Sequence, residues 1–309
     1  MRRRSTTSSS PRPGSTWRDR PTRPRRRPAS SRRCRREGEA PNRARCLLAN
    51  RAHPPMSQIG YLAQRSLTRT LRQPAVVVSS MIFPLFLLAV NASGLSAATD
   101  LPDFPTDSYL TFALGLTFMQ GALFATMGAG QAIAQDIQGG FFNRLQLTPL
   151  RGPALIVGQL SGVALQGAFQ AVTYLLVGIA FGADLEAGIA GALLLLALAM
   201  LVAVAFGSLG LALGLRTGNG EAVQGAFPLL FVLLFLSSGA LPRDLIANDW
   251  FQAITTVNPV SYIIEAFRSL LISGWDGEAL ALGFGCALAV LAAGTFAATA
   301  ALRTRMART

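Results

Sequence analysis

The chain has 309 residues, of which 51% are hydrophobic and only 14% are charged, whereas soluble domains carry about 25% charged residues. The formal net charge of +13 arises in the first 55 residues, which hold 17 of the 28 basic residues and three of the 15 acidic ones. The rest of the chain is apolar and nearly neutral. This composition excludes an ordinary soluble enzyme and predicts an all-α integral membrane protein.

Residues 1–55 are rich in Arg, Pro and Ser and have too little apolar surface to offset the entropy of ordering, so we expect them to be disordered. One interpretation is a polybasic arm that binds anionic lipid or nucleic acid. The other, which we favour, is an extension upstream of a true start at Met56. On that interpretation the chain has no nucleic-acid partner, and its domain is 56–309.

Six segments are long and apolar enough to cross a bilayer, which takes about 20 residues. They cover approximately 75–98, 109–133, 153–181, 187–215, 223–241 and 279–302. With six spans, nine arginines of 56–309 fall on one face of the membrane, and only Arg243 and Arg268 fall on the other. Because arginine-rich loops remain in the cytoplasm, both termini are expected there.

Several chemistries are excluded by missing residue types. An ATP-hydrolysing P-loop needs a lysine, and the chain contains none. The part from Met56 onward also lacks histidine and has a single cysteine, Cys286. We therefore expect no catalytic, metal-binding or cofactor-binding residues, and the energy for any pumping must come from a partner.

The segment 57–72 alternates apolar residues with arginines at helical spacing. Its basic residues are Arg65, Arg69 and Arg72. This pattern predicts a helix in the cytoplasmic interface with its arginines at the lipid headgroups. The alternative is a simple leader to the first span.

The cytoplasmic loop 134–152 is short and contains exposed aromatic and apolar residues. Its candidate functional residues are Asp136, Phe141, Phe142, Leu145, Leu147, Thr148, Pro149 and Arg151. Exposed aromatics on such a loop indicate membrane contact or a docking surface, and the residues alone leave both open.

The loop 242–278 is too polar to span the membrane but contains many apolar residues. Asn258-Pro259 predicts a helix start, and Glu265 and Arg268 then lie three apart, close enough to pair. We interpret the loop as two short helices that dip partway into the membrane from outside, with an ordinary surface helix as the alternative.

In the spans, Gly210 and Gly214 could face either another helix of the chain or a second subunit.

These two loops resemble those of the membrane subunit of type-2 ABC exporters, a permease family that includes daunorubicin-resistance proteins. The first loop carries Asp136, Gly139-Gly140, Leu145, Thr148-Pro149 and Arg151. The second carries Ser238-Gly239, Pro242, Trp250, Asn258, Pro259, Tyr262, Glu265 and Arg268. The resemblance covers 56–309. It departs from the family where Gln159 replaces the usual lysine, and where Asp136 is the only acid opening the first loop.

The resemblance implies six spans, an interfacial helix, a coupling helix in 134–152, and re-entrant helices before the last span. It also implies a dimer with a second permease chain, either a copy of this chain or a different one, and two copies of a separate ATPase, which would bind ATP and Mg. The chain would move a hydrophobic or amphipathic substrate, such as an antibiotic, out across a bacterial plasma membrane. The alternatives are export of lipid or polysaccharide, and a membrane assembly factor or sensor that transports nothing.

Overall fold

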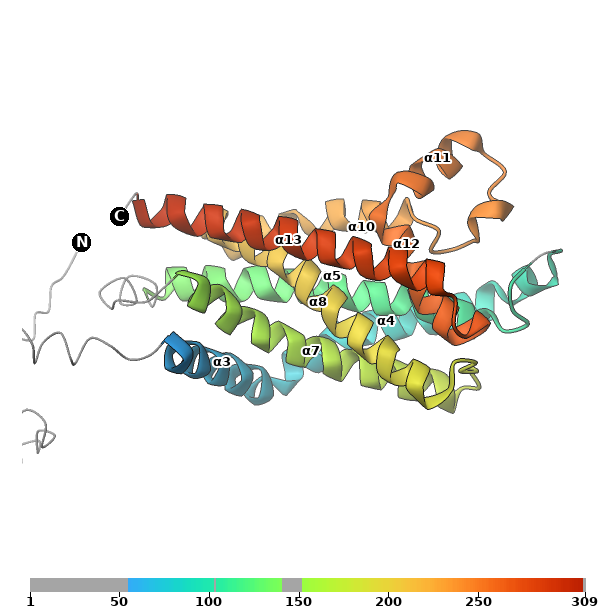
Figure 1. Cartoon of the computed structure of the whole chain (residues 1–309), viewed down its shortest axis with the longest axis horizontal. Helices are drawn as coiled ribbons and strands as arrows, with labels where there is room; N and C mark the ends of the chain where they lie inside the picture. Colours follow the sequence, from blue (N-terminus) through green and yellow to red (C-terminus); the bar gives the residue numbers. More distant parts are fainter. Residues whose placement is uncertain (1–54, 103, 141–151, 308–309) are drawn as a thin grey trace, which may run out of the picture. The chain divides into compact units, whose positions relative to one another are not determined.

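The computed structural model describes residues 55–102, 104–140 and 152–307, and all regular structure within these ranges is helical (Figure 1). The helices are α3 (Pro55–Arg72), α4 (Pro74–Gly94), α5 (Tyr109–Gln138), α7 (Gly152–Ala180), α8 (Gly188–Thr217), α9 (Gly220–Gly225), α10 (Phe227–Phe235), α11 (Asp249–Val257), α12 (Pro259–Arg268) and α13 (Gly277–Ala307). Two short 3-10 helices, η1 (Ser96–Asp100) and η2 (Arg243–Leu245), and one short π-helix, η3 (Ser269–Ser273), complete the described elements. The predictions made for residues 1–54 and for the loop 141–151 lie outside the described residues.

Five of these helices, α4, α5, α7, α8 and α13, are long and apolar enough to cross a membrane. They fall on five of the six predicted spans. Many of their large apolar side chains point away from the rest of the protein, including Ile82, Phe86, Leu176, Ile179 and Phe296. Such an outward apolar surface is expected of helices that face lipid. The described part of the chain therefore has the architecture of a multi-pass membrane protein.

The remaining predicted span, 223–241, is not one continuous helix. The apolar stretch Gly220–Phe235 is divided into α9 and α10, with Ala226 between them. Pro228 in the first turn of α10 has no backbone N–H to continue the ladder from α9, and the chain turns at Ser237. The count of six spans is therefore not confirmed, and a sixth crossing stays a prediction.

Helix α5 is the centre of the bundle and packs against α4, α7, α8 and α12. Its closest neighbour is α8, where the two backbones approach through glycine. A methyl group on Gly210 would strike the carbonyl of Thr126, and one on Gly214 would strike the carbonyl of Gly130. These glycines therefore serve packing between two helices of the same chain.

The predicted helix over 57–72 is present as α3, which lies along α7 (Figure 1). Glycines again permit the contact, because Gly158 of α7 faces Leu62 and Gly162 faces Ser66. Figure 1 places α3 at the end of the bundle where α13 finishes. The location of α3 at a membrane surface stays a prediction.

Candidate functional site

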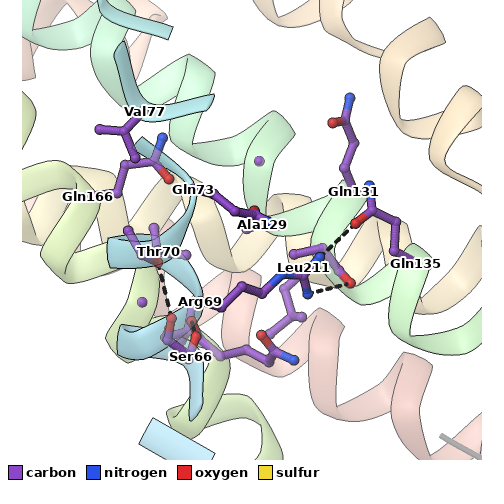
Figure 2. A pocket seen from close by; sticks show the side chains of 16 residues that line it. Ser66, Arg69, Thr70, Gln73, Val77, Ala129, Gln131, Gln135, Gln166 and Leu211 are labelled. Carbon is purple, nitrogen blue, oxygen red and sulfur yellow. Dashed lines mark hydrogen bonds between the residues drawn. The ribbon is translucent and has the colours of Figure 1, made fainter. Parts of the chain in front are cut away.

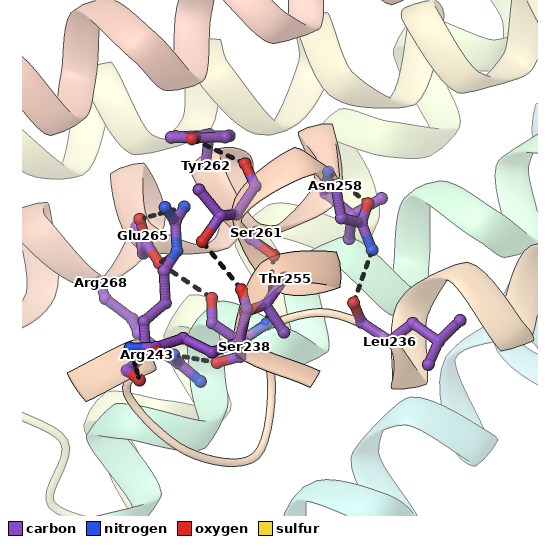
Figure 3. Close-up of polar contacts among 12 residues, drawn as sticks. Leu236, Ser238, Arg243, Thr255, Asn258, Ser261, Tyr262, Glu265 and Arg268 are labelled. Atoms are coloured by element: carbon purple, nitrogen blue, oxygen red, sulfur yellow. Dashed lines mark hydrogen bonds and ion pairs between the residues drawn. The ribbon is translucent and has the colours of Figure 1, made fainter. Parts of the chain in front are cut away.

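Helix α12 begins at Asn258, whose side chain connects two helix ends (Figure 3). Its Oδ1 accepts a hydrogen bond from the backbone N–H of Val260, at 3.0 Å. Its Nδ2 donates to the carbonyls of Leu233 and Leu236, at 2.7 and 2.9 Å. Asn258 thus caps the start of α12 and satisfies carbonyls left open at the end of α10. This confirms the predicted helix start at Asn258-Pro259.

Arg268, at the end of α12, is only 6% exposed and reaches three backbone carbonyls. Nε donates to Phe112 at 3.1 Å, Nη1 donates to Ser238 at 2.6 Å, and Nη2 donates to Gly239. The centre of the guanidinium lies 3.4 Å from the centroid of the Phe112 ring. Arg268 therefore joins α5, α12 and the turn that follows α10.

The predicted ion pair between Glu265 and Arg268 is wrong. Glu265 pairs instead with Arg243, whose Nε lies 2.7 Å from Oε1 and whose Nη2 donates to Oε2 at 2.8 Å. The hydroxyl of Ser238 also donates to Oε1, at 2.9 Å. Spacing along α12 did not decide the pairing, because the turn after α10 offers Arg268 buried carbonyls and brings Arg243 to Glu265. We call Ser238, Gly239, Arg243, Asn258, Glu265 and Arg268 the α12 cluster.

Other residues of the predicted re-entrant motif surround this cluster. A methyl group on Gly239 would lie 2.8 Å from Leu116 Cδ1 of α5, so the turn packs closely there. Tyr262 donates to the carbonyl of Thr256 at 2.8 Å and lies against the guanidinium of Arg243, whose centre is 4.1 Å from the ring centroid. Pro242 directly precedes η2. Trp250, by contrast, is 63% exposed and does not join the cluster.

A second cluster lies where α3, α5 and α7 meet, around the 7%-exposed Asp136. Arg65 Nη2 lies 2.8 Å from Oδ1 and its Nη1 donates to Oδ2 at 3.1 Å. Arg69 Nη1 is 3.4 Å from Oδ1, and Gln159 Nε2 donates to Oδ2 at 3.0 Å. We call Arg65, Arg69, Asp136 and Gln159 the α3 cluster.

This cluster gives two of the α3 arginines a partner within the protein. Arg65 and Arg69 bond to Asp136 of α5, because a buried carboxylate is costly without hydrogen bonds and opposite charge. Contact of these arginines with lipid headgroups stays a prediction. Arg72 is exposed. Gln159, noted in the sequence only as a departure from the family, is part of the cluster. Asp136 is one of only two acids, with Glu221, on the arginine-rich face, and this was the signal that could have indicated the pairing.

Most residues of the predicted coupling loop lie in the range 141–151, outside the described part of the chain. They are Phe141, Phe142, Leu145, Leu147, Thr148, Pro149 and Arg151. Their helix and their docking role stay predictions. Within the described ranges, no three His, Cys, Asp or Glu side chains lie close enough together to hold a metal ion. The chemistry available in the two clusters is ion pairing and hydrogen bonding between helices.

Five apolar helices of membrane-spanning length define a multi-pass membrane protein. The chain belongs to the ABC-2 type transporter family, whose family model matches residues 57–272. That range begins in α3, ends in η3 and contains both clusters.

Two relatives have names that refer to drug resistance. The "Daunorubicin resistance ABC transporter permease protein DrrB1" of Streptomyces coeruleorubidus is 29% identical over 241 residues, which are 76% of this chain and 78% of the relative. The "Probable doxorubicin resistance ABC transporter permease protein DrrC" of Mycobacterium tuberculosis is 21% identical over 211 residues, which are 68% and 75% of the two chains.

Proposed function

We propose that the chain is the membrane permease subunit of an ATP-driven exporter and moves a hydrophobic or amphipathic substrate outward. The observation that carries this proposal is the family match over residues 57–272, which includes every helix from α3 to α12. The absence of lysine from the sequence agrees with it, since an intact P-loop would have to be on another chain.

The partners in this proposal are two copies of an ABC ATPase, which bind ATP and Mg, and a second copy of this chain. Phe141 to Thr148 form a coupling helix that fits a groove of the ATPase. Asp136 lies in the last turn of α5, before Phe141, and is held by Arg65 and Arg69 of α3, so a push on the coupling helix acts on α3 and α5 together. The complex lies in the bacterial plasma membrane with both termini in the cytoplasm.

Helix α5 gives the proposal a mechanical link between the two clusters. Its last turns hold Asp136, and its first turns supply Phe112, which accepts from Arg268. The helix has 30 residues, so at 1.5 Å per residue it is about 45 Å long. A displacement at the α3 cluster is therefore transmitted to the α12 cluster, which supports a switch between inward and outward states by movement of packed helices.

The substrate class rests on two observations. The two relatives above are named for resistance to the antibiotics daunorubicin and doxorubicin, and we extend an antibiotic substrate to the present chain. The five candidate spans are strongly apolar, which suits amphipathic cargo better than ions. Export of a lipid or polysaccharide remains the second candidate.

Co-purification from native membranes tests the proposal. The tagged chain, solubilised gently, should recover an ABC ATPase in equimolar amount, as measured by mass spectrometry. Changing both Phe141→Asp and Phe142→Asp should remove the ATPase while the chain stays folded. Trp275→Asp, an exposed aromatic far along the chain, is the matched control and should retain it. Recovery of the wild-type chain alone, from membranes where it is folded and abundant, would favour an assembly factor or sensor.

A further inference from the structure

A cavity of about 230 Å³ lies between α3, α5 and α7, next to the α3 cluster (Figure 2). Five of its lining residues are glutamines, namely Gln73, Gln131, Gln135, Gln159 and Gln166. They come from three different segments of the chain, because Gln73 precedes α4, Gln131 and Gln135 belong to α5, and Gln159 and Gln166 belong to α7. The fold thus gathers amides that are widely separated in the sequence.

Three of these amides have no hydrogen-bond partner within the described ranges. Gln135 accepts from Arg69 Nη2 at 2.6 Å, and Gln159 donates to Asp136 at 3.0 Å. For the side chains of Gln73, Gln131 and Gln166, no described residue supplies a hydrogen-bond partner. Gln73 is exposed, and Gln131 and Gln166 are half-buried, so these three amides are open to a bound molecule.

The row of amides continues one helical turn deeper along α7. Gln170 is 2% exposed and its Nε2 donates to Ser80 of α4, at 3.0 Å. Its Oε1 is buried and has no hydrogen-bond partner among the described residues. The polar side of the cavity therefore leads from Gln166 toward the interior of the candidate span.

Among the described residues that line the cavity, one is charged, Arg69. Its guanidinium already contacts Asp136. Apolar side chains complete the wall, including Val77, Val163 and Leu211. A wall of this kind favours an uncharged polar group, because a cation would meet Arg69 and an anion would compete with Asp136.

We propose that this cavity binds the uncharged, hydroxyl-rich head group of the amphipathic molecule that the chain transports. An amide both donates and accepts, so Gln73, Gln131 and Gln166 match hydroxyl groups, which do the same. Cavities for whole drug-sized ligands are about 300–1,000 Å³, so this smaller one takes a head group while the apolar part lies outside it. The assignment rests on the transport function proposed above and specifies its substrate class.

Binding of octyl glucoside tests this assignment. The full-length chain is placed in lipid nanodiscs, and radiolabelled octyl glucoside is titrated below its micellar concentration, with empty nanodiscs as background. We expect a saturable component that is displaced by unlabelled octyl glucoside more strongly than by octyl sulfate or octyltrimethylammonium. Free glucose has no apolar chain, so it should displace bound octyl glucoside only weakly. If glucose displaces as well as unlabelled octyl glucoside at the same concentration, the site does not bind an amphipath.

Glutamine variants locate the bound head group. Gln166→Leu and Gln131→Leu should each weaken binding between about twofold and tenfold, as expected for the loss of one hydrogen bond. Gln224→Leu is the matched control, since Gln224 is exposed on α9 and does not line the cavity; it should bind as wild type. Melting curves establish that each variant is folded.

Absence of a saturable component, equal displacement by all three head groups, or an equal effect of Gln224→Leu would overturn the assignment. The binding measurement needs no ATPase, so it is independent of the co-purification test. An ATPase recovered without saturable binding contradicts only the site, and binding without an ATPase contradicts the exporter.

Discussion

Replacing Arg268 with leucine removes the donor that three buried carbonyls share, those of Phe112, Ser238 and Gly239. A hydrogen bond to a charged group contributes about 1.5–3 kcal/mol, so three give an upper limit of roughly 5–9 kcal/mol. Removing the cation also removes the cost of burying it, which offsets part of this loss. We therefore expect Arg268→Leu to lower the free energy of unfolding by about 3–5 kcal/mol.

The assay is the apparent melting temperature of the purified chain in a single detergent, followed by intrinsic fluorescence. For a domain of this size, each kcal/mol corresponds to about 2–4 °C, so the expected shift is on the order of 10 °C. Arg268→Lys keeps the positive charge but lacks the planar guanidinium group that donates to three acceptors. Its melting temperature should lie between those of wild type and Arg268→Leu. This intermediate value separates the geometry of the guanidinium from its charge.

Arg303→Leu is the matched control, because Arg303 is exposed near the end of α13. An exposed substitution of this kind changes stability by no more than about 0.5 kcal/mol. If Arg268→Leu melts at the same temperature as Arg303→Leu, the α12 cluster does not hold α5, α12 and the intervening turn together, and the reasoning fails.

Three further predictions use the same melting assay. Asp136→Ala and Arg65→Ala, combined in a double-mutant cycle, should show a coupling of about 0.5–1 kcal/mol, since Arg65 keeps 38% of its side chain exposed; additive effects would contradict a direct pair. Gly214→Ala would place a methyl group against the backbone of Gly130 and should cost about 1–3 kcal/mol, whereas Gly285→Ala, which meets open space, should be nearly neutral. Asn258→Ala removes a helix cap and the donor to two carbonyls and should cost about 1–3 kcal/mol; wild-type melting would refute that role.

The features predicted correctly from the sequence are local ones. Helix α3, the five long apolar helices and the start of α12 at Asn258 each depend on a continuous stretch of residues whose length and pattern can be read directly. An apolar run of 20 or more residues leaves few structures open in a membrane, so composition alone was sufficient. The break between α9 and α10 was missed because hydropathy averages over Pro228 and the small residues before it.

The pairings in the two clusters could not be predicted, because they join residues far apart in the chain. Arg65 and Asp136 are 71 positions apart, and Arg268 lies 156 positions from the Phe112 carbonyl to which it donates. Helical spacing indicated only which side chains share a face with Arg268. Which of them pair depends on the open carbonyls and charges that the packed helices bring to that face.

The α12 cluster also explains the two exceptions to the arginine asymmetry that predicts the orientation. Arg243 is paired with Glu265, and Arg268 is buried against backbone carbonyls. Both arginines therefore have a packing role on the side of the membrane that is predicted to be otherwise poor in arginine. The rule that arginines mark the cytoplasmic side concerns loops at the ends of spans, and these two residues have a structural reason to be where they are.

Single cysteines test this orientation directly. In a background with Cys34, Cys46 and Cys286 changed to serine, Thr217→Cys places a thiol at the end of α8, and Glu278→Cys places one at the start of α13; both positions are exposed. A maleimide that cannot cross membranes should label intact cells at position 278 and not at 217, while both label after the cells are opened. The reverse pattern on intact cells would put the termini outside. It would also move the α3 cluster away from the side where an ATPase binds ATP, and the proposed coupling could not operate.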